Sequence, residues 1–303
     1  MKILITGATG LVGNAIVKEC HRNNIEVHYL TTSKNKIATE PNFKGFYWNP
    51  ESLEIDLRCF EGVEAIINLA GASISKRWTD SYKKEILNSR INSLKTLHKG
   101  LKSINTSSIK SLVSASAIGI YPSSLNKLYE EDTQIDDDGF LSEVVKKWEK
   151  EVNTFDEFNL NIVKIRIGLV LSNKGGALPE MAKPIKFFAG SAYGTGEQWQ
   201  SWIHIKDLAR LFLFAIKDEL AGIYNGVASN PVTNKKLVSK IGAAIGKPIF
   251  LPHVPASLLK LVLGEMSELL LASQRVSNKK IINEGFVFKF ENVSAALESI
   301  YKN

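Results

Sequence analysis

The stretch MKILITGATGLVG (residues 1–13) decides the fold class of this chain. An apolar run at Lys2–Thr6 ends in a glycine, and apolar residues then recur at helical spacing from Leu11 to about Arg22. Between the two lies a glycine triplet of the form GxxGxxG. A strand, a glycine-rich turn and a helix in this order are typical of the first βαβ unit of a dinucleotide-binding domain.

The glycine triplet predicts a site for a pyrophosphate. Gly7 permits the tight turn, Gly10 lets the phosphates approach the backbone, and Gly13 lets the helix pack closely on the sheet. The first N–H groups of the helix and the positive end of its dipole then face the phosphates. The other residues expected to contact the cofactor here are Thr9, Leu11 and Val12.

The rest of the first half repeats the alternation of strands and helices. Apolar runs at residues 27–30, 65–69, 111–114 and 162–167 indicate strands, and residues 80–102 and 142–158 carry helical stripes. Strands that alternate with helices form a parallel sheet whose two faces are both covered. We therefore expect an α/β fold, a Rossmann-type doubly wound parallel sheet, with ligand loops at the carboxyl ends of its strands.

The pattern changes after Gly168. Residues 190–196 are rich in glycine, helical stretches alternate with short strands such as residues 223–225, and prolines interrupt the last third. We expect a dinucleotide-binding domain over residues 1–170. A smaller, mostly helical substrate or lid region would follow over residues 171–303.

Composition excludes several classes of protein. Among the 303 residues, 38 lysines and arginines exceed 31 acids by +7, but the lysines are scattered from Lys2 to Lys302, which does not predict nucleic-acid binding. The acidic stretch at residues 130–138 has no histidine nearby and indicates a solvated loop, so we expect no metal site. The expected partner is a small-molecule substrate, with the chain a monomer or a homodimer.

Cysteine usage and hydropathy bear on the compartment. Cys20 and Cys59 are isolated thiols, which suits a reducing environment. No stretch reaches the roughly 20 apolar residues that span a bilayer, and the N-terminal apolar run is too short for a secretion signal. We expect a cytoplasmic protein that has no contact with a membrane.

The end of the second strand bears on the choice between NADP and NAD. An NAD site usually places a carboxylate there to accept from the ribose 2′-hydroxyl, whereas a 2′-phosphate needs basic or hydroxyl donors. This chain has Thr31, Thr32, Ser33 and Lys34, followed by Lys36, and no acid before residue 40. The sequence therefore favours NADP(H), with NAD the less favoured cofactor.

Several further motifs resemble the extended short-chain dehydrogenase/reductase superfamily, and more closely its atypical "epimerase family" branch. The motifs are NLAG (residues 68–71), SKRW (75–78), SRI (89–91), SAS (114–116) and WIHIKD (202–207). Residues 252–288 are similar to the uncharacterised C-terminal domain of that branch, so residues 233–303 would be a family-specific tail. The resemblance covers nearly the whole chain.

The resemblance implies further contacts with the cofactor. The backbone of Leu69, Ala70 and Gly71 would lie against it, as in family members. An arginine at the place of Arg90, with Glu85 five residues before it, would also contact it. The remaining implied contacts are Ser114 at the end of its strand, and Gly168 and Leu169, where superfamily members pass the nicotinamide carboxamide.

The catalytic residues are where this chain departs from the superfamily. Its enzymes use a tyrosine as proton donor or acceptor and a lysine four residues later to lower the phenol pKa. Alignment on Trp148-Glu149 places Phe140 and Val144 at these positions, and neither side chain can transfer a proton. The remaining candidates are Ser116, Tyr121 and His204, the last in a glycine-rich segment that could form a lid, whereas Asp207 is expected to cap the following helix.

Two functions stay open on the sequence alone. The first is a nicotinamide-dependent oxidoreductase or epimerase of unassigned substrate. The second is a non-catalytic NADP-binding sensor or scaffold on the same fold, because the tyrosine–lysine pair is missing.

Overall fold

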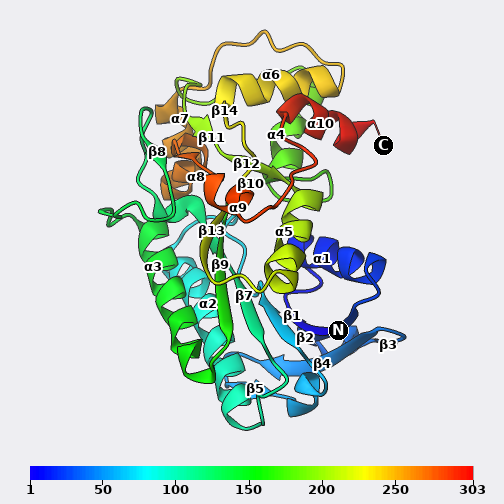
Figure 1. The fold of residues 1–303 in the computed structure, drawn as a ribbon. Helices are drawn as coiled ribbons and strands as arrows, with labels where there is room; N and C mark the ends of the chain where they lie inside the picture. Colours follow the sequence, from blue (N-terminus) through cyan, green and yellow to red (C-terminus); the bar gives the residue numbers. More distant parts are fainter. Residues whose placement is uncertain (303) are drawn as a thin grey trace.

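The computed structural model describes residues 1–302, and its centre is a twisted, mostly parallel sheet (Figure 1). Seven parallel strands lie in the order β4–β2–β1–β6–β7–β9–β13. Their bounds are β1 Lys2–Thr6, β2 Glu26–Thr31, β4 Phe43–Asn49, β6 Ala65–Asn68, β7 Ser111–Ala117, β9 Asn161–Ile167 and β13 Gly222–Gly226. Two short strands, β3 (Thr39–Glu40) and β5 (Glu54–Ile55), pair antiparallel with β4.

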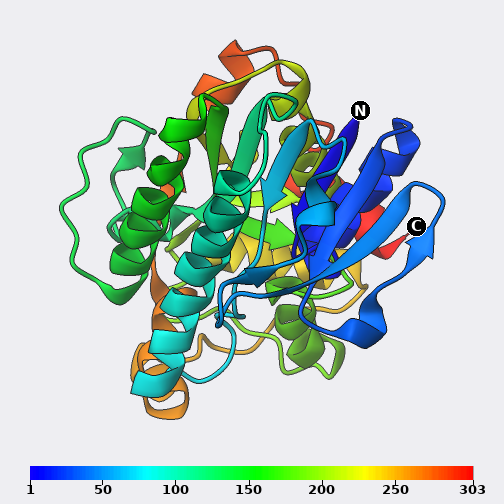
Figure 2. The same cartoon turned by 90° about the horizontal axis from the view of Figure 1, so that it is seen from below.

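Helices cover both faces of this sheet. Helix α1 (Leu11–Arg22) packs beside α5 (Ile205–Lys217) on one face, and α2 (Asp80–Lys102) packs beside α3 (Phe140–Asn153) on the other (Figures 1 and 2). The strands between these layers are apolar and buried, as in Ile3, Leu4 and Ile5 of β1. The sheet is therefore doubly wound, and the predicted fold class is confirmed.

The strand order reverses direction at β1. The chain proceeds from β1 to β2 and β4 on one side, and then returns to place β6 on the other side of β1. In open α/β sheets, ligands bind outside the carboxyl ends of the strands at such a switch point. The glycine-rich loop after β1 and residues 69–71 after β6 both lie there.

The rest of the chain forms a smaller region above the sheet in Figure 1. Its strands pair two by two: β10 (Leu169–Leu171) with β12 (Trp202–His204), β11 (Trp199–Gln200) with β14 (Val232–Thr233), and β8 (Leu128–Tyr129) with β15 (Arg275–Val276). Its helices are α4 Ala177–Lys186, α6 Asn234–Ala244, α7 Ala256–Leu263, α8 Glu268–Leu271, α9 Lys279–Asn283 and α10 Val293–Tyr301. A separate apolar core, which includes Leu171, Trp202 and Leu237, holds β10, β12, α4, α6 and α10 together.

Residues beyond the predicted boundary at residue 170 also contribute to the main sheet and to the helices that cover it. Strand β13 pairs in parallel with β9 and completes the main sheet, and α5 covers that sheet beside α1. The strand expected near residues 223–225 is β13 and therefore belongs to the main sheet. Within residues 1–302, no helix is both long enough and apolar enough to cross a bilayer.

Candidate cofactor and substrate site

The loop between β1 and α1 has the geometry of a phosphate site. Gly7 adopts a left-handed φ of +69°, and a Cβ there would lie 3.2 Å from the backbone of Leu69. A Cβ at Gly13 would lie 2.2 Å from the carbonyl oxygen of Gly7, so only glycine lets the helix approach the loop this closely. A Cβ at Gly10 would make one tight contact, with the Gly7 oxygen at 3.2 Å, and would otherwise have room.

The start of α1 has the features of an anion-binding site. Gly10 is the N-cap residue and supplies no side chain to cap the helix, and the first turn contains no acid. The first N–H groups of a helix lack partners within the helix, and its dipole places partial positive charge there. The residues present therefore fit a bound pyrophosphate.

A chain of buried hydrogen bonds fixes the neighbouring strand ends. The Thr6 hydroxyl donates to Asn68 Oδ1 (2.8 Å) and accepts from the backbone N–H groups of Leu69 (3.0 Å) and Ala70 (3.1 Å). The Asn68 amide donates to Ser114 Oγ (3.1 Å). These hydrogen bonds hold residues 69–71 against the glycine loop. The Ser114 hydroxyl is an acceptor within the same network.

The end of β2 carries hydroxyls and lysines. Thr31 is buried, and its Oγ1 accepts from the backbone N–H of Ser33 (3.2 Å) in a tight turn. Thr32 and Lys34 are exposed, and Lys34 Nζ lies 5.1 Å from the centre of the Tyr47 ring at the end of β4. A 2′-phosphate at this strand end would find donors and no carboxylate among the residues of the turn.

Arg90 lies under the loop that follows β6. Its guanidinium carbon would be 3.1 Å from a Cβ at Gly71, and it stacks 5.1 Å from the centre of the Trp148 ring. One N–H donates to the carbonyl oxygen of Ile86 (2.7 Å), and burial lowers the Arg90 pKa to about 10. Among residues 1–302 no carboxylate forms an ion pair with Arg90, and Glu85 is exposed, so the structure does not bring these two residues together.

A cavity of about 200 Å³ opens beside Arg90 and Gly168-Leu169. Gly168 is tightly enclosed, since a Cβ there would lie 2.2 Å from the Ser201 carbonyl oxygen. Val144, one of the two positions aligned with the missing catalytic pair, lines the cavity. Phe140, the other, packs edge-on against Trp78 with ring centres 5.0 Å apart. Arg90 is the one ionisable side chain on the cavity wall among the described residues.

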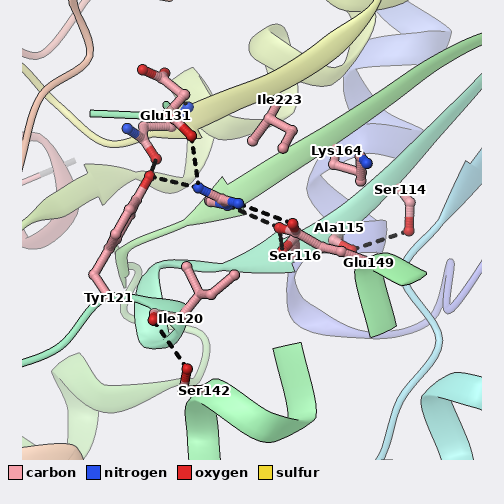
Figure 3. Close-up of polar contacts among 12 residues, drawn as sticks. Ser114, Ala115, Ser116, Ile120, Tyr121, Glu131, Ser142, Glu149, Lys164 and Ile223 are labelled. Carbon is pink, nitrogen blue, oxygen red and sulfur yellow. Dashed lines mark hydrogen bonds and ion pairs between the residues drawn. The ribbon is translucent and has the colours of Figure 1, made fainter. Parts of the chain in front are cut away.

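The candidate catalytic residues Ser116 and Tyr121 belong to a buried polar network centred on Arg166 (Figure 3). The Ser116 hydroxyl donates to Glu149 Oε1 (2.6 Å), and Arg166 binds both carboxylate oxygens of Glu149, at 2.9 and 3.0 Å. Arg166 Nη1 also donates to the Tyr121 hydroxyl (3.0 Å), which itself donates to Asn225 Oδ1 (2.8 Å). The network thus connects β7, β9, α3 and β13.

This network holds Ser116 and Tyr121 in structural positions. Neither residue is on the wall of the cavity. Burial raises the pKa of Tyr121, against the opposing charge of Arg166. Burial alone would lower the pKa of Arg166, but the hydrogen bonds and charge of Glu149 outweigh it and raise that pKa. A phenol with a raised pKa that already donates to Asn225 is poorly suited to exchange protons with a substrate.

His204 also has a structural environment, which differs from the lid position expected for it. It is the N-cap of α5, where Nδ1 accepts from the backbone N–H of Lys206 (3.0 Å), and its ring stacks on Phe290 at 3.9 Å. Nε2 lies 3.2 Å from Ser299 Oγ, and burial lowers the His204 pKa to about 4. The structure therefore does not bring His204 together with Ser116 and Tyr121.

The expectation that Asp207 caps this helix is wrong, because the helix begins earlier, at Ile205. Asp207 lies in its first turn, fully buried, and accepts from the backbone N–H groups of Lys289 (3.0 Å) and Phe290 (2.9 Å). It also pairs with Arg210 (2.9 Å). Asp207 therefore ties the C-terminal segment to α5.

Sequence reasoning missed the roles of Glu149, Arg166 and Glu131. Glu131 lies in the acidic stretch expected to be a solvated loop, yet its carboxylate accepts from the backbone N–H of Asn225 (2.8 Å), and burial raises its pKa. The one signal available was an arginine between two isoleucines in a predicted strand, where a buried charge requires a partner.

The sheet order, the glycine loop at the switch point and the open start of α1 define a dinucleotide-binding protein of the short-chain dehydrogenase/reductase type. The model of the NAD dependent epimerase/dehydratase family matches residues 3–225, and a domain of unknown function, DUF1731, matches residues 254–300. The chain belongs to the NAD dependent epimerase/dehydratase family. This confirms the resemblance seen in the sequence.

Named relatives agree with this assignment. The chain is 37% identical over 303 residues to the epimerase family protein SH2119 of Staphylococcus haemolyticus, covering 99% of this chain and 98% of that one. The crystal structure of human epimerase family protein SDR39U1 (isoform 2) with NADPH has a TM-score of 0.86 and 28% identity, covering 100% of both chains. The UDP-glucuronic acid 4-epimerase of Bacillus cereus (TM-score 0.79, 16% identity, covering 100% of this chain and 98% of that one) shares the fold.

Proposed function

We propose that this protein binds NADP(H) in preference to NAD(H) and is an oxidoreductase or epimerase of the family whose substrate is not a common nucleotide sugar. The observation that carries the cofactor preference is the end of β2, where Thr31, Ser33 and Lys34 stand and no carboxylate is present. A 2′-phosphate gains from donors and positive charge, and a carboxylate at this place would repel it. The similar human protein crystallised with NADPH supports the same choice.

Different residues of the described chain would bind different parts of the cofactor. The glycine loop and the first turn of α1 would bind the pyrophosphate through backbone N–H groups, and residues 31–34 would receive the 2′-phosphate. The backbone of residues 69–71, the Arg90 guanidinium and Gly168-Leu169 would border its nicotinamide half. The bound cofactor would supply hydride chemistry, and the apolar wall around Val144 would exclude water from the reacting end.

The missing tyrosine–lysine pair limits the reaction. General acid–base help is typically worth about 10²–10⁴-fold in rate. With Ser116 and Tyr121 held by Arg166 and Glu149, this chain is not expected to epimerise nucleotide sugars at the rates of enzymes that keep the pair.

A second candidate, a non-catalytic NADP-binding sensor or scaffold, is favoured by one observation. Arg90 is the one ionisable side chain on the described wall of the cavity, so no carboxylate, histidine or tyrosine there can exchange a proton. Transfer of deuterium from 4-deuterated NADPH to any member of a carbonyl-compound library separates the two functions. Transfer above the rate without protein supports the oxidoreductase. Tight NADPH binding with no transfer to any compound supports the sensor.

A further inference from the structure

We propose that the substrate of this site is a carbonyl compound with a hydrocarbon body, whose carbonyl end enters the cavity beside Arg90 and Trp148. This inference rests on the proposed function, because it takes Gly168-Leu169 and Arg90 as the cofactor's side of the cavity. It adds the chemical class of the molecule that meets the cofactor there.

The first argument is the composition of the cavity wall. Apolar side chains from several elements line it, among them α2, α3, α8, the end of β7, the end of β9 and the start of β10. These side chains include Ile86, Leu141, Val144, Val145, Leu169 and Leu269. Such a wall favours a ligand in proportion to the apolar surface that the ligand brings out of water.

The second argument is that several polar groups on the wall already have partners. The Ser201 hydroxyl donates to the Gln274 carbonyl oxygen (2.8 Å) and accepts from the Val276 N–H (2.9 Å). The Gln274 amide donates to the Tyr121 carbonyl oxygen (2.7 Å), and the Trp199 indole donates to the Leu125 carbonyl oxygen (2.9 Å). A hexose ring brings several hydroxyls that each need a partner when buried, and this wall leaves few for them.

The third argument is the kind of polar group that remains. The Trp148 indole Nε1 is buried without a hydrogen-bond partner within the described chain, and Trp148 lines the cavity. Arg90, also on the wall, makes one hydrogen bond, to the Ile86 carbonyl oxygen, out of the five that a guanidinium can donate. Both groups are donors, and among the described residues no carboxylate lines the cavity. The Gln200 side chain also lines the cavity and has no hydrogen bond within the described chain, so its amide offers one further acceptor and further donors. A ligand that offers one acceptor, such as a carbonyl oxygen, suits this set better than a polyol.

A larger cleft provides room for the body of such a molecule. It has a volume of about 940 Å³, lies between the N-terminal ends of α2 and α3 and the segment from α7 to α8, and shares Ala272 with the cavity. Its wall includes Leu125, Phe140 and Leu271. Lys83 of α2 forms an ion pair with Glu265, just before α8, and both residues line this cleft. We place the hydrocarbon body along the apolar part of this cleft, next to Ala272; the charged side chains of the cleft, Lys83, Lys260, Glu265 and Glu268, would border it.

The test uses straight-chain 2-alkanones as probes, from 2-butanone to 2-nonanone, with UDP-glucose as the nucleotide-sugar comparison. Binding to the NADPH-saturated protein is followed by the intrinsic fluorescence of its five tryptophans, of which Trp148 and Trp199 line the cavity. NADPH binding is first measured separately by calorimetry. We expect affinity to rise roughly three- to fourfold per added methylene, which corresponds to about 0.8 kcal/mol for each buried CH₂. We also expect UDP-glucose to bind more weakly than 2-nonanone.

A pair of variants checks that the alkanones occupy this cavity. Leu269→Gln places an amide on the cavity wall, and we expect it to weaken 2-nonanone binding at least several-fold. Leu261→Gln is the matched control, because Leu261 is 80% exposed on α7 and lies on neither wall. Affinity independent of chain length, equal losses in both variants, or tighter binding of UDP-glucose would overturn this inference alone if NADPH binds. A protein that does not bind NADPH would overturn the proposed function as well.

Discussion

Replacing Gly10 by valine separates the phosphate site from the stability of the fold. Gly10 has φ −76° and ψ 177°, an extended conformation that valine adopts readily. A Cβ there meets only the Gly7 carbonyl oxygen, at 3.2 Å. Since Gly10 is the N-cap of α1 and glycine is preferred to valine at that position, we expect a loss of stability of about 1 kcal/mol. In a chain of 303 residues such a loss lowers the melting temperature by roughly 1.5–2 °C.

The effect of this substitution on the cofactor should be much larger. The valine side chain would fill the space through which the pyrophosphate approaches the start of α1. A hydrogen bond to a charged group contributes about 1.5–3 kcal/mol, so the loss of two such bonds costs about 3–6 kcal/mol. We therefore expect NADPH affinity to fall at least a hundredfold, since each 1.4 kcal/mol is tenfold.

Calorimetric titration with NADPH and thermal unfolding followed by circular dichroism measure the two effects. Gly13→Ala is the contrasting variant, because its Cβ would lie 2.2 Å from the Gly7 oxygen and 2.7 Å from the Ala8 Cα. We expect that variant to lose both stability and binding, whereas Gly10→Val loses mainly binding. NADPH affinity within threefold of wild type in a folded Gly10→Val protein would refute the placement of the phosphates.

Three further predictions concern the buried polar groups. Tyr121→Phe should lower the free energy of unfolding by about 1–3 kcal/mol and leave NADPH affinity within twofold, and a large loss of affinity in calorimetry would contradict this role. Glu149→Leu should cost about 3–5 kcal/mol in urea denaturation by leaving Arg166 buried and unpaired, whereas Glu143→Gln, which removes an exposed ion pair, should cost less than about 1 kcal/mol. Burial lowers the folded-state pKa of His204 to about 4, so its contribution to stability is complete above the unfolded pKa of about 6.5 and falls as the pH drops from 6.5 to 4. His204→Asn should therefore reduce the drop in melting temperature between pH 7.5 and 4.5, and an unchanged drop would count against this assignment.

The parts of the fold that local patterns determine could be predicted from the sequence. Strand β1 lies at the predicted residues, and β2, β6, β7 and β9 differ from their predicted bounds by a few residues at most. Their runs are apolar because both faces of a parallel sheet are covered, which gives a clear signal. The glycine loop could be predicted as well, because the spacing of its three glycines reflects contacts within residues 7–13.

Strand β4 (Phe43–Asn49) was not predicted. It lies near the edge of the sheet, and its mixture of aromatic, polar and glycine residues lacks the apolar run of the central strands. Gly45 is required there by a distant residue: a Cβ would lie 2.5 Å from the Tyr29 ring of β2. The bounds of α5 were missed for a related reason. Histidine and aspartate can both cap a helix. In the folded chain His204 is the N-cap, and the Asp207 carboxylate accepts from the backbone N–H groups of Lys289 and Phe290 instead.

The buried network could not be read from spacing. The hydrogen bond between Tyr121 and Asn225 joins residues 104 positions apart, and the pairing of Arg166 with Glu149 requires knowledge that α3 lies over β9. Sequence reasoning placed Ser116 and Tyr121 near the strand ends, where catalytic groups of this fold are found. The direction of their side chains depends on partners from three other elements, and no local pattern shows it.

The preference for NADP(H) is tested most directly by titrating the wild-type protein with NADPH and with NADH in the same buffer by calorimetry. The donors and lysines after β2 predict that NADPH binds at least several-fold tighter. Lys34→Glu should narrow the difference by removing positive charge and adding the kind of carboxylate found at NAD sites. Equal affinities for NADPH and NADH in the wild-type protein would show that Lys34 and Lys36 are surface residues without a role in recognition. That result would contradict the proposed preference for NADP(H).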